Sequence, residues 1–224
     1  ILNRILRAAP WQMAAGGALA LLVLIFGTAL LGVSGWFITA TGIAGLAGGG
    51  RADLRHHGGV DKALHLYPVE HYAVLAAEWP QCASAVGAGF LGENISTHGL
   101  TEHDICIGDV LRIGDARVQV SQTRSPCWKI DLRLKVDGAS RFVEAAGITG
   151  WYYRVLQPGA IAAGDEIEVL ERLNPWLTLT AYWDAVTAHR PDPELLARIA
   201  ASPGLAADKA QRWRERAAWL RAHR

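Results

Sequence analysis

Charged side chains are almost missing from the first fifty residues of this chain. Of its 22 Lys and Arg residues, Arg4 and Arg7 lie there, and all 21 Asp and Glu residues come later. The whole chain has a net charge of +1, so no overall electrostatic field attracts nucleic acid. We therefore expect a charge-poor N-terminal segment, a charge-balanced domain after it and no nucleic-acid partner.

Cysteine is also scarce, and no phosphate-loop motif occurs. Cys82, Cys106 and Cys127 are too widely spaced for a disulfide framework or a zinc ribbon. The histidines between residues 56 and 71 do not have the spacing of a common zinc site either. The motif G-x-x-x-x-G-K-[ST] is absent, which excludes an ATP-driven exporter subunit.

An uncharged apolar stretch fills most of the first fifty residues. A helix over residues 12–38 would be about 40 Å long, which exceeds the roughly 30 Å hydrocarbon core of a bilayer. A cleaved signal peptide is the alternative, but its apolar region normally spans about 7–15 residues. We therefore predict one transmembrane helix and a Gly-rich linker within residues 1–50, with the lipid bilayer contacted through residues 12–38.

The following residues, 51–175, show short strands with turns between them. Residues 110–113 and 116–120 alternate apolar and polar side chains around Gly114 and Asp115, which predicts a hairpin. Residues 166–169 predict a further strand, and such strands favour a small barrel over βαβ units. A short helix is expected over residues 68–79. The fold class is therefore predicted to be mainly β.

The last part of the chain, residues 176–224, changes to a helical pattern. Helices are predicted over residues 179–188, 193–201 and 207–222, with proline and glycine between them. We therefore expect a C-terminal segment of three helices after the β domain.

Cys127 is the centre of the most informative stretch, since it follows the hairpin and lies between Arg124 and Lys129. Nearby cations stabilise a thiolate, which is both a nucleophile and a ligand for soft metals. A single cysteine can equally be an inert small hydrophobe. The residues alone leave both readings open.

Two resemblances to known families are visible. Residues 124–127 (RSPC) resemble the signature of the MOSC family, the molybdenum-cofactor sulfurase C-terminal domain. Residues 57–64 (HGGVDKAL), 90–100 (FLGENISTHGL) and 147–152 (GITGWY) fit its YiiM-type branch. Residues 30–40 (LLGVSGWFITA) resemble the first transmembrane helix of the CydC-type subunit of a thiol-reductant ABC exporter.

The MOSC resemblance implies a β-barrel that binds a molybdenum-pterin cofactor. It implies that Cys127 is catalytic and ligates the metal through its thiolate. The residues expected to bind the cofactor are polar or flank the pocket: Arg124, Ser125, Asn94, Lys129, His57, Gly58 and Asp61.

The same resemblance implies an oxidoreductase. Its substrates would be N-hydroxylated compounds such as hydroxylaminopurines or amidoximes, and a separate flavoprotein would supply electrons. In YiiM-type proteins about fifty residues of barrel precede the His-Gly-Gly motif, and here the exporter-like segment stands in their place. A domain without cofactor and a persulfide carrier on Cys127 therefore stay open as alternatives.

The expected location is a bacterial inner membrane. Arg4 and Arg7 favour a cytoplasmic N-terminus, which would place the domain outside the cytoplasm. A molybdenum cofactor and its electron donors favour a cytoplasmic domain, and we expect that orientation.

Overall fold

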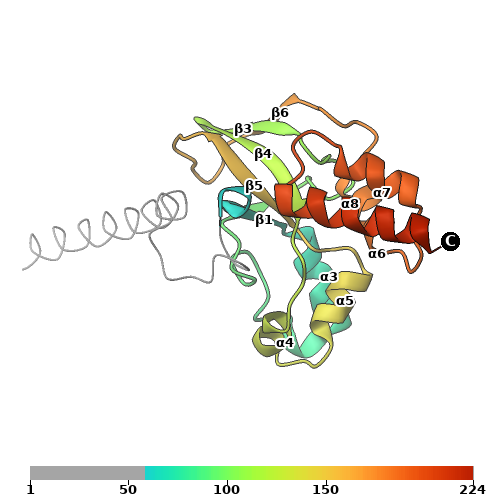
Figure 1. The fold of residues 1–224 in the computed structure, drawn as a ribbon. Coiled ribbons are helices and arrows are strands. Elements are labelled where there is room, and N and C mark those ends of the chain that lie inside the picture. The colour runs from blue at the N-terminus through green and yellow to red at the C-terminus, as the bar shows by residue number, and fades with distance from the viewer. Residues whose placement is uncertain (1–58, 224) are drawn as a thin grey trace, which may run out of the picture. The chain divides into compact units, whose positions relative to one another are not determined.

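One mixed sheet organises residues 59–223, the part of the chain described by this computed structural model (Figure 1). Its strands follow the order β2-β1-β5-β4-β3-β6. Their bounds are β1 Leu64–Pro68, β2 Ile95–Thr97, β3 Val110–Ile113, β4 Ala116–Thr123, β5 Trp151–Gln157 and β6 Ile167–Glu171.

The described part of the chain also contains α-helices and two 3₁₀ turns. Two single 3₁₀ turns are η1 Val60–Lys62 and η2 Pro80–Cys82. The α-helices are α3 Glu70–Glu78, α4 Lys129–Leu134, α5 Ala139–Ala145, α6 Leu179–Thr187, α7 Pro193–Ala200 and α8 Ala207–Ala222.

The hairpin of β3 and β4 is confirmed. The two strands pair antiparallel, with Val110 opposite Gln119 and Ile113 opposite Ala116. Gly114 at the turn has a φ of 55°, a left-handed conformation that favours glycine. Local alternation and turn chemistry were therefore enough to locate this pair.

The prediction of a mainly β barrel without βαβ units is wrong. Strand β1 pairs parallel with β2 and antiparallel with β5, so the sheet is mixed. Parallel neighbours need a long crossover, and here α3, η2 and a loop make it. In the described residues β2 and β6 are the two edges of the sheet, so the sheet does not close on itself. A cavity of about 650 Å³ lies between residues 94–100 and 161–167, near these two edges. The architecture is a half-barrel with helices.

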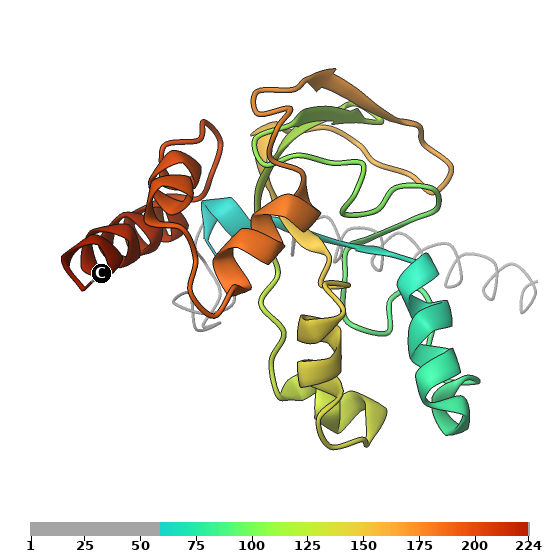
Figure 2. The ribbon, with the colours of Figure 1, turned by 90° about the vertical axis from the view of Figure 1, so that its right-hand side faces the viewer.

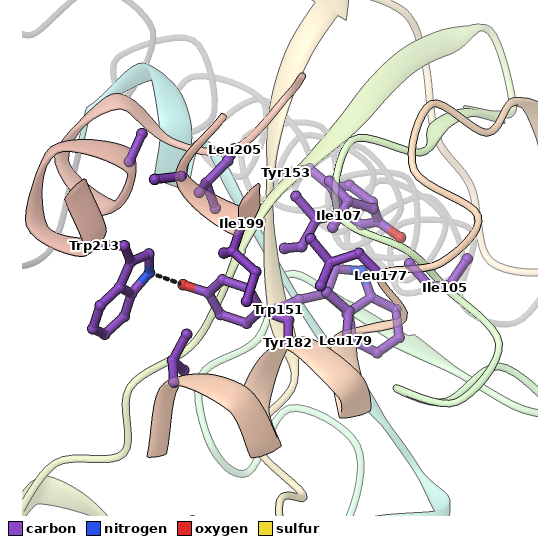
Figure 3. Packing of buried hydrophobic residues seen from close by; sticks show 14 of the residues in the cluster. Ile105, Ile107, Trp151, Tyr153, Leu177, Leu179, Tyr182, Ile199, Leu205 and Trp213 are labelled. Carbon is purple, nitrogen blue, oxygen red and sulfur yellow. Dashed lines mark hydrogen bonds between the residues drawn. The ribbon is translucent and has the colours of Figure 1, made fainter. Parts of the chain in front are cut away.

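The main core lies between the sheet and the three C-terminal helices. Leu66 is fully buried in it. Trp151 and Tyr182 are fully buried in it too (Figure 3). The indole N–H of Trp213 on α8 donates to the Tyr182 hydroxyl on α6 at 2.9 Å. The three helices predicted from the sequence are confirmed, and this contact joins two of them inside the core.

A second core is formed by α3, α4 and α5. Tyr67, Leu75, Ile130 and Val143 are buried in it. Figure 2 shows these teal and yellow helices below the sheet, with the red α7 and α8 to one side. Because side chains alternate along a strand, β1 sends Leu66 into the first core and Tyr67 into the second.

The transmembrane part of the predicted fold class gains no support. Among residues 59–223, no helix has both the length and the apolar character needed to cross a bilayer. The longest described helix, α8, has 16 residues and carries several arginines. Residues 12–38 and the exporter-like segment lie outside the described residues, so the predicted bilayer contact stays a prediction.

A buried, hydrogen-bonded pair of polar side chains fixes the start of β5 against the helical side of the molecule. The Glu102 carboxylate lies 2.7 Å from His71 Nε2 and accepts from the Gly150 N–H at 2.8 Å. Both side chains are buried. Replacing Glu102 by alanine should lower the free energy of unfolding by about 3 kcal/mol, because it leaves buried polar groups unpaired.

Urea unfolding followed by circular dichroism measures this loss. The control is Glu168→Ala, which breaks an exposed pair with Arg112 and should cost about 0–1 kcal/mol. Equal losses in the two variants would contradict the structural role of Glu102.

Candidate functional site

A row of polar side chains crosses three neighbouring strands on one face of the sheet. His65 of β1 lies opposite Tyr152 of β5, and Tyr152 lies opposite Gln122 of β4. Asn94, directly before β2, extends the row, since its Oδ1 accepts from the His65 N–H at 2.8 Å. These four residues line the same cavity.

A β-bulge in β4 turns Gln122 towards this cavity. The register between β4 and β5 shifts between Val120, opposite Tyr153, and Gln122, opposite Tyr152. An extra residue changes which face the following side chains occupy. Val120 is therefore buried in the core, whereas Gln122 faces the cavity. The extra residue, Ser121, is buried and donates its hydroxyl to the Tyr152 carbonyl at 3.0 Å.

The cavity has a volume of about 350 Å³ and is strongly cationic. Five of its lining side chains are Lys or Arg, and none of its described lining residues is Asp or Glu. The lining residues are Lys62, His65, Leu91, Gly92, Asn94, Gln122, Arg124, Ser125, Cys127, Lys129, Ile130, Arg133, Tyr152 and Lys209. Such a lining suits an anionic ligand.

The loop between β4 and α4 carries the predicted cysteine. Cys127 is half-buried and lines the cavity, and its carbonyl accepts from the Ile130 N–H at 2.9 Å. The Arg124 N–H donates to the Gly150 carbonyl at 3.0 Å, which ties this loop to the start of β5. Gly150 must be glycine, because an added Cβ would lie 2.4 Å from the Leu66 carbonyl oxygen.

The structure brings five of the predicted residues together around this cavity. They are Arg124, Ser125, Asn94, Lys129 and Cys127.

Of the other three predicted residues, the structure describes only Asp61. Asp61 does not line the cavity, and its carboxylate accepts from Arg154 Nε at 2.8 Å. Its neighbour Lys62 lines the cavity instead. His57 and Gly58 lie outside the described residues, and their predicted roles stay predictions.

Sequence reasoning missed several lining residues. His65 directly follows the HGGVDKAL motif, and Gln122 lies just before the RSPC motif, so both motifs pointed near them. Lys209 comes from α8, and only the packing of the C-terminal helices brings it to the cavity. No local pattern identifies such a residue.

Three buried polar atoms in this cavity have no partner within the described part of the chain. They are His65 Nε2, Gln122 Nε2 and Arg124 Nη1. Buried polar atoms are normally hydrogen-bonded, because leaving one unpaired costs about 1–3 kcal/mol. All three residues line the cavity, so a bound ligand can satisfy them.

Burial and neighbouring cations keep two bases of the cavity less protonated than usual. Burial, with a smaller effect of the Arg124 charge, lowers the pKa of His65 to about 3. Burial also lowers the pKa of Lys209, and the nearby Arg212 and Lys62 act in the same direction. Burial raises the pKa of the Tyr152 hydroxyl. His65 is therefore neutral at physiological pH.

No group of three or more His, Cys, Asp or Glu side chains able to hold a metal ion occurs among residues 59–223. Cys127 is the single cysteine that lines the cavity. A metal bound there would need most of its ligands from another molecule. An anionic cofactor that carries its own metal ligands fits both the single cysteine and the cationic lining.

Comparison with known proteins assigns this architecture to a family. The model of the MOSC domain matches residues 53–168. The chain belongs to the MOSC domain family. The matched region includes Cys127 and most of the residues that line the cavity.

The relatives include a protein of known structure and a protein named as a reductase. Protein YiiM of Escherichia coli is 38% identical over 162 residues, which are 72% of this chain and 71% of that protein. Its crystal structure superimposes with a TM-score of 0.68 at 34% identity, covering 72% of this chain and 80% of that one. A protein named "Reductase" from Gibberella moniliformis is 33% identical over 75% of this chain and 29% of its own length. The YiiM-type resemblance is confirmed.

Proposed function

We propose that this MOSC domain binds a molybdenum-pterin cofactor in the cavity around Cys127 and reduces N-hydroxylated compounds. The single observation that carries the proposal is the composition of that cavity. One cysteine, five cationic side chains and three unpartnered buried polar atoms converge on about 350 Å³ without a lining carboxylate. The relative named "Reductase" supports the reaction class.

Each group in the cavity has a distinct part in this proposal. The Cys127 thiolate is the protein ligand of the metal, since sulfur is the soft donor that the cavity offers. Arg124, with its unpartnered Nη1, binds the phosphate of the cofactor, because its guanidinium matches phosphate oxygens. Ser125 and Asn94 orient the pterin through hydroxyl and amide groups. When bound, the cofactor supplies a metal centre that exchanges electrons and an oxygen atom with the substrate.

The overall reaction balances with an external electron donor. An N-hydroxylated compound takes up two electrons and two protons, its N–O bond breaks, and the oxygen leaves as water. The electrons come from a separate flavoprotein, which is part of the proposal. The cationic groups at the cavity favour an acidic surface on that partner.

An amidoxime assay tests the proposal. Protein produced in cells that make the molybdenum cofactor is supplied with benzamidoxime and a reduced viologen dye, and benzamidine is measured. We expect turnover by the unaltered chain and loss of turnover in Cys127→Ser. Bound molybdenum without turnover would contradict the reductase activity. Cyanide-labile sulfur on Cys127 without molybdenum would favour the persulfide carrier.

Replacing Arg124 by glutamine should weaken binding of a metal-free pterin phosphate about 10- to 100-fold. A hydrogen bond to a charged group contributes about 1.5–3 kcal/mol, and about 1.4 kcal/mol changes affinity tenfold. Quenching of the intrinsic fluorescence of neopterin monophosphate measures the dissociation constant.

The matched control for this prediction is Arg112→Gln, which removes an exposed arginine of β3 outside the cavity. It should leave the dissociation constant unchanged. Equal affinity of Arg124→Gln and the unaltered chain would show that Arg124 does not hold the phosphate.

A further inference from the structure

A cavity of about 250 Å³, which we call the α8 cavity, lies next to the cavity around Cys127. Its described lining residues belong to the end of β4 and the loop after it, to α5, to α6 and to α8. Ser125 and Lys209 line both cavities, so the two lie side by side at these residues. A ligand at Cys127 is therefore close to the α8 cavity.

Three cations on one face of α8 line the α8 cavity. Lys209, Arg212 and Arg216 are three and four positions apart, which places them on the same side of a helix. Among the described lining residues Glu144, on α5, is the single acid, so cations outnumber acids three to one. Within residues 59–223 no carboxylate forms an ion pair with any of these three cations. Their charges are therefore available to an anion.

Hydrogen bonds of two tryptophans hold the walls of the α8 cavity in place. The indole N–H of Trp183 donates to the Glu144 carbonyl at 2.9 Å, which joins α6 to α5. The indole N–H of Trp213 donates to the Tyr182 hydroxyl, which joins α8 to α6. The guanidinium of Arg212 lies over the Trp213 ring, 5.1 Å from its centroid, a cation–π contact that orients it. Contacts within the protein therefore set the shape of the cavity.

Lys209 lies where the two cavities meet. Burial lowers the pKa of its amine, and the charges of Arg212 and Lys62 act in the same direction, whereas Asp208 opposes them. Arg212 lines the α8 cavity, and Lys62 lines the cavity around Cys127. A negative charge bound between these cations would relieve their mutual repulsion. The junction of the two cavities therefore favours a ligand that brings an anionic group.

We propose that the α8 cavity binds the phosphate or carboxylate group of a substrate whose N-hydroxylated end reacts in the cavity around Cys127. The guanidinium groups of Arg212 and Arg216 match the oxygens of either anion, and Lys209 adds a point charge at the junction. This inference rests on the proposed function and adds the substrate class. The substrate is an N-hydroxylated compound with an acidic group remote from its N–O bond.

A series of para-substituted benzamidoximes tests the inference in the full chain loaded with cofactor. Benzamidoxime itself has no acidic group, and the others carry a carboxylate or a phosphonate on spacers of increasing length. The test variant combines Arg212→Gln with Arg216→Gln. Its matched control is Arg214→Gln, which changes an exposed arginine of α8 that donates to Gln211 outside the α8 cavity.

We expect the best acidic compound to have a KM about tenfold below that of benzamidoxime at a similar kcat, because the remote anion is bound equally in the ground state and the transition state. The double variant should remove this difference, and Arg214→Gln should keep it. A lower KM for the phosphonates identifies phosphate as the acidic group of the substrate, and a lower KM for the carboxylates identifies a carboxylate.

Tryptophan signals locate the acidic group without turnover. In the cofactor-free chain labelled with ¹⁵N-tryptophan, the indole signals of Trp183 and Trp213 should move when the preferred acidic compound binds, since both side chains line the α8 cavity. Benzamidoxime should not move them. Arg124→Gln should keep the movement, because Arg124 lines the other cavity, and the double variant should lose it.

The outcomes separate this inference from the proposed function. Turnover of benzamidoxime without a preference for any acidic compound would overturn the inference and leave the proposed function standing. A preference that Arg124→Gln removes and the double variant keeps would place the acidic group in the cavity around Cys127, which would also overturn the inference. Movement of the two indole signals without turnover of any compound would support the anion site and contradict the proposed reaction.

Discussion

Cys127→Ser should retain less than about a tenth of the molybdenum of the unaltered chain but nearly all of its affinity for metal-free neopterin monophosphate. A serine hydroxyl stays protonated near neutral pH and is a harder donor than a thiolate, so the metal loses its protein ligand. In the proposed function the phosphate and the pterin are bound by other groups of the cavity, among them Arg124, Ser125 and Asn94. Metal analysis and fluorescence titration of the same samples measure the two effects.

The control for this substitution is Cys82→Ser, a buried cysteine outside the cavity that donates to the Leu134 carbonyl at 3.3 Å. It should keep its molybdenum and lose on the order of 1 kcal/mol of stability. If Cys127→Ser kept its molybdenum, the proposed ligand would be wrong. If both variants lost metal and pterin in parallel, general unfolding would be the cause.

Acidification from pH 6.5 to pH 4 should destabilise the unaltered chain by about 3 kcal/mol more than His65→Gln. The pKa of His65 is lowered to about 3 in the folded state, from about 6.5 in the unfolded one. Between these values the unfolded state binds a proton that the folded state does not, so stability falls as the pH falls. Between the two pKa values, each pH unit changes the free energy of unfolding by about 1.4 kcal/mol.

Urea unfolding at several pH values measures this difference. Other titrating groups are common to both proteins, so the difference in slope isolates His65. The two proteins should have parallel stability profiles above pH 6.5, and the profile of the unaltered chain should fall more steeply below it. Parallel profiles down to pH 4 would show that His65 is protonated in the folded state.

Helices and strands that are defined by the pattern of neighbouring residues were predicted well from the sequence. The hairpin of β3 and β4 has alternating side chains and a Gly-Asp turn, and the C-terminal helices have clear breaks between them. Strand β1 was missed because it has five residues and ends at Pro68, which was predicted to begin the following helix. Without β1, its parallel pairing with β2 could not be predicted, so the strands were expected to close into a barrel.

The site, too, contains residues that a local motif identifies and residues that only strand pairing brings to it. Arg124, Ser125, Cys127 and Lys129 are contiguous in sequence, so one motif placed them together. His65 reaches the cavity through strand register, which a sequence pattern does not specify. The bulge at Ser121 reverses the side on which the following residues lie, and only the observed pairing with β5 places them.

The molar ratio of molybdenum to protein tests the central claim most directly. The chain is produced in cells that make the molybdenum cofactor, purified without chelators, and measured by plasma mass spectrometry beside Cys127→Ser. The cationic cavity with a single cysteine predicts a ratio of about one in the unaltered chain and a loss of most of that metal in the variant. A ratio near zero in the unaltered chain, with cofactor supplied, would contradict the account and favour a MOSC domain without cofactor.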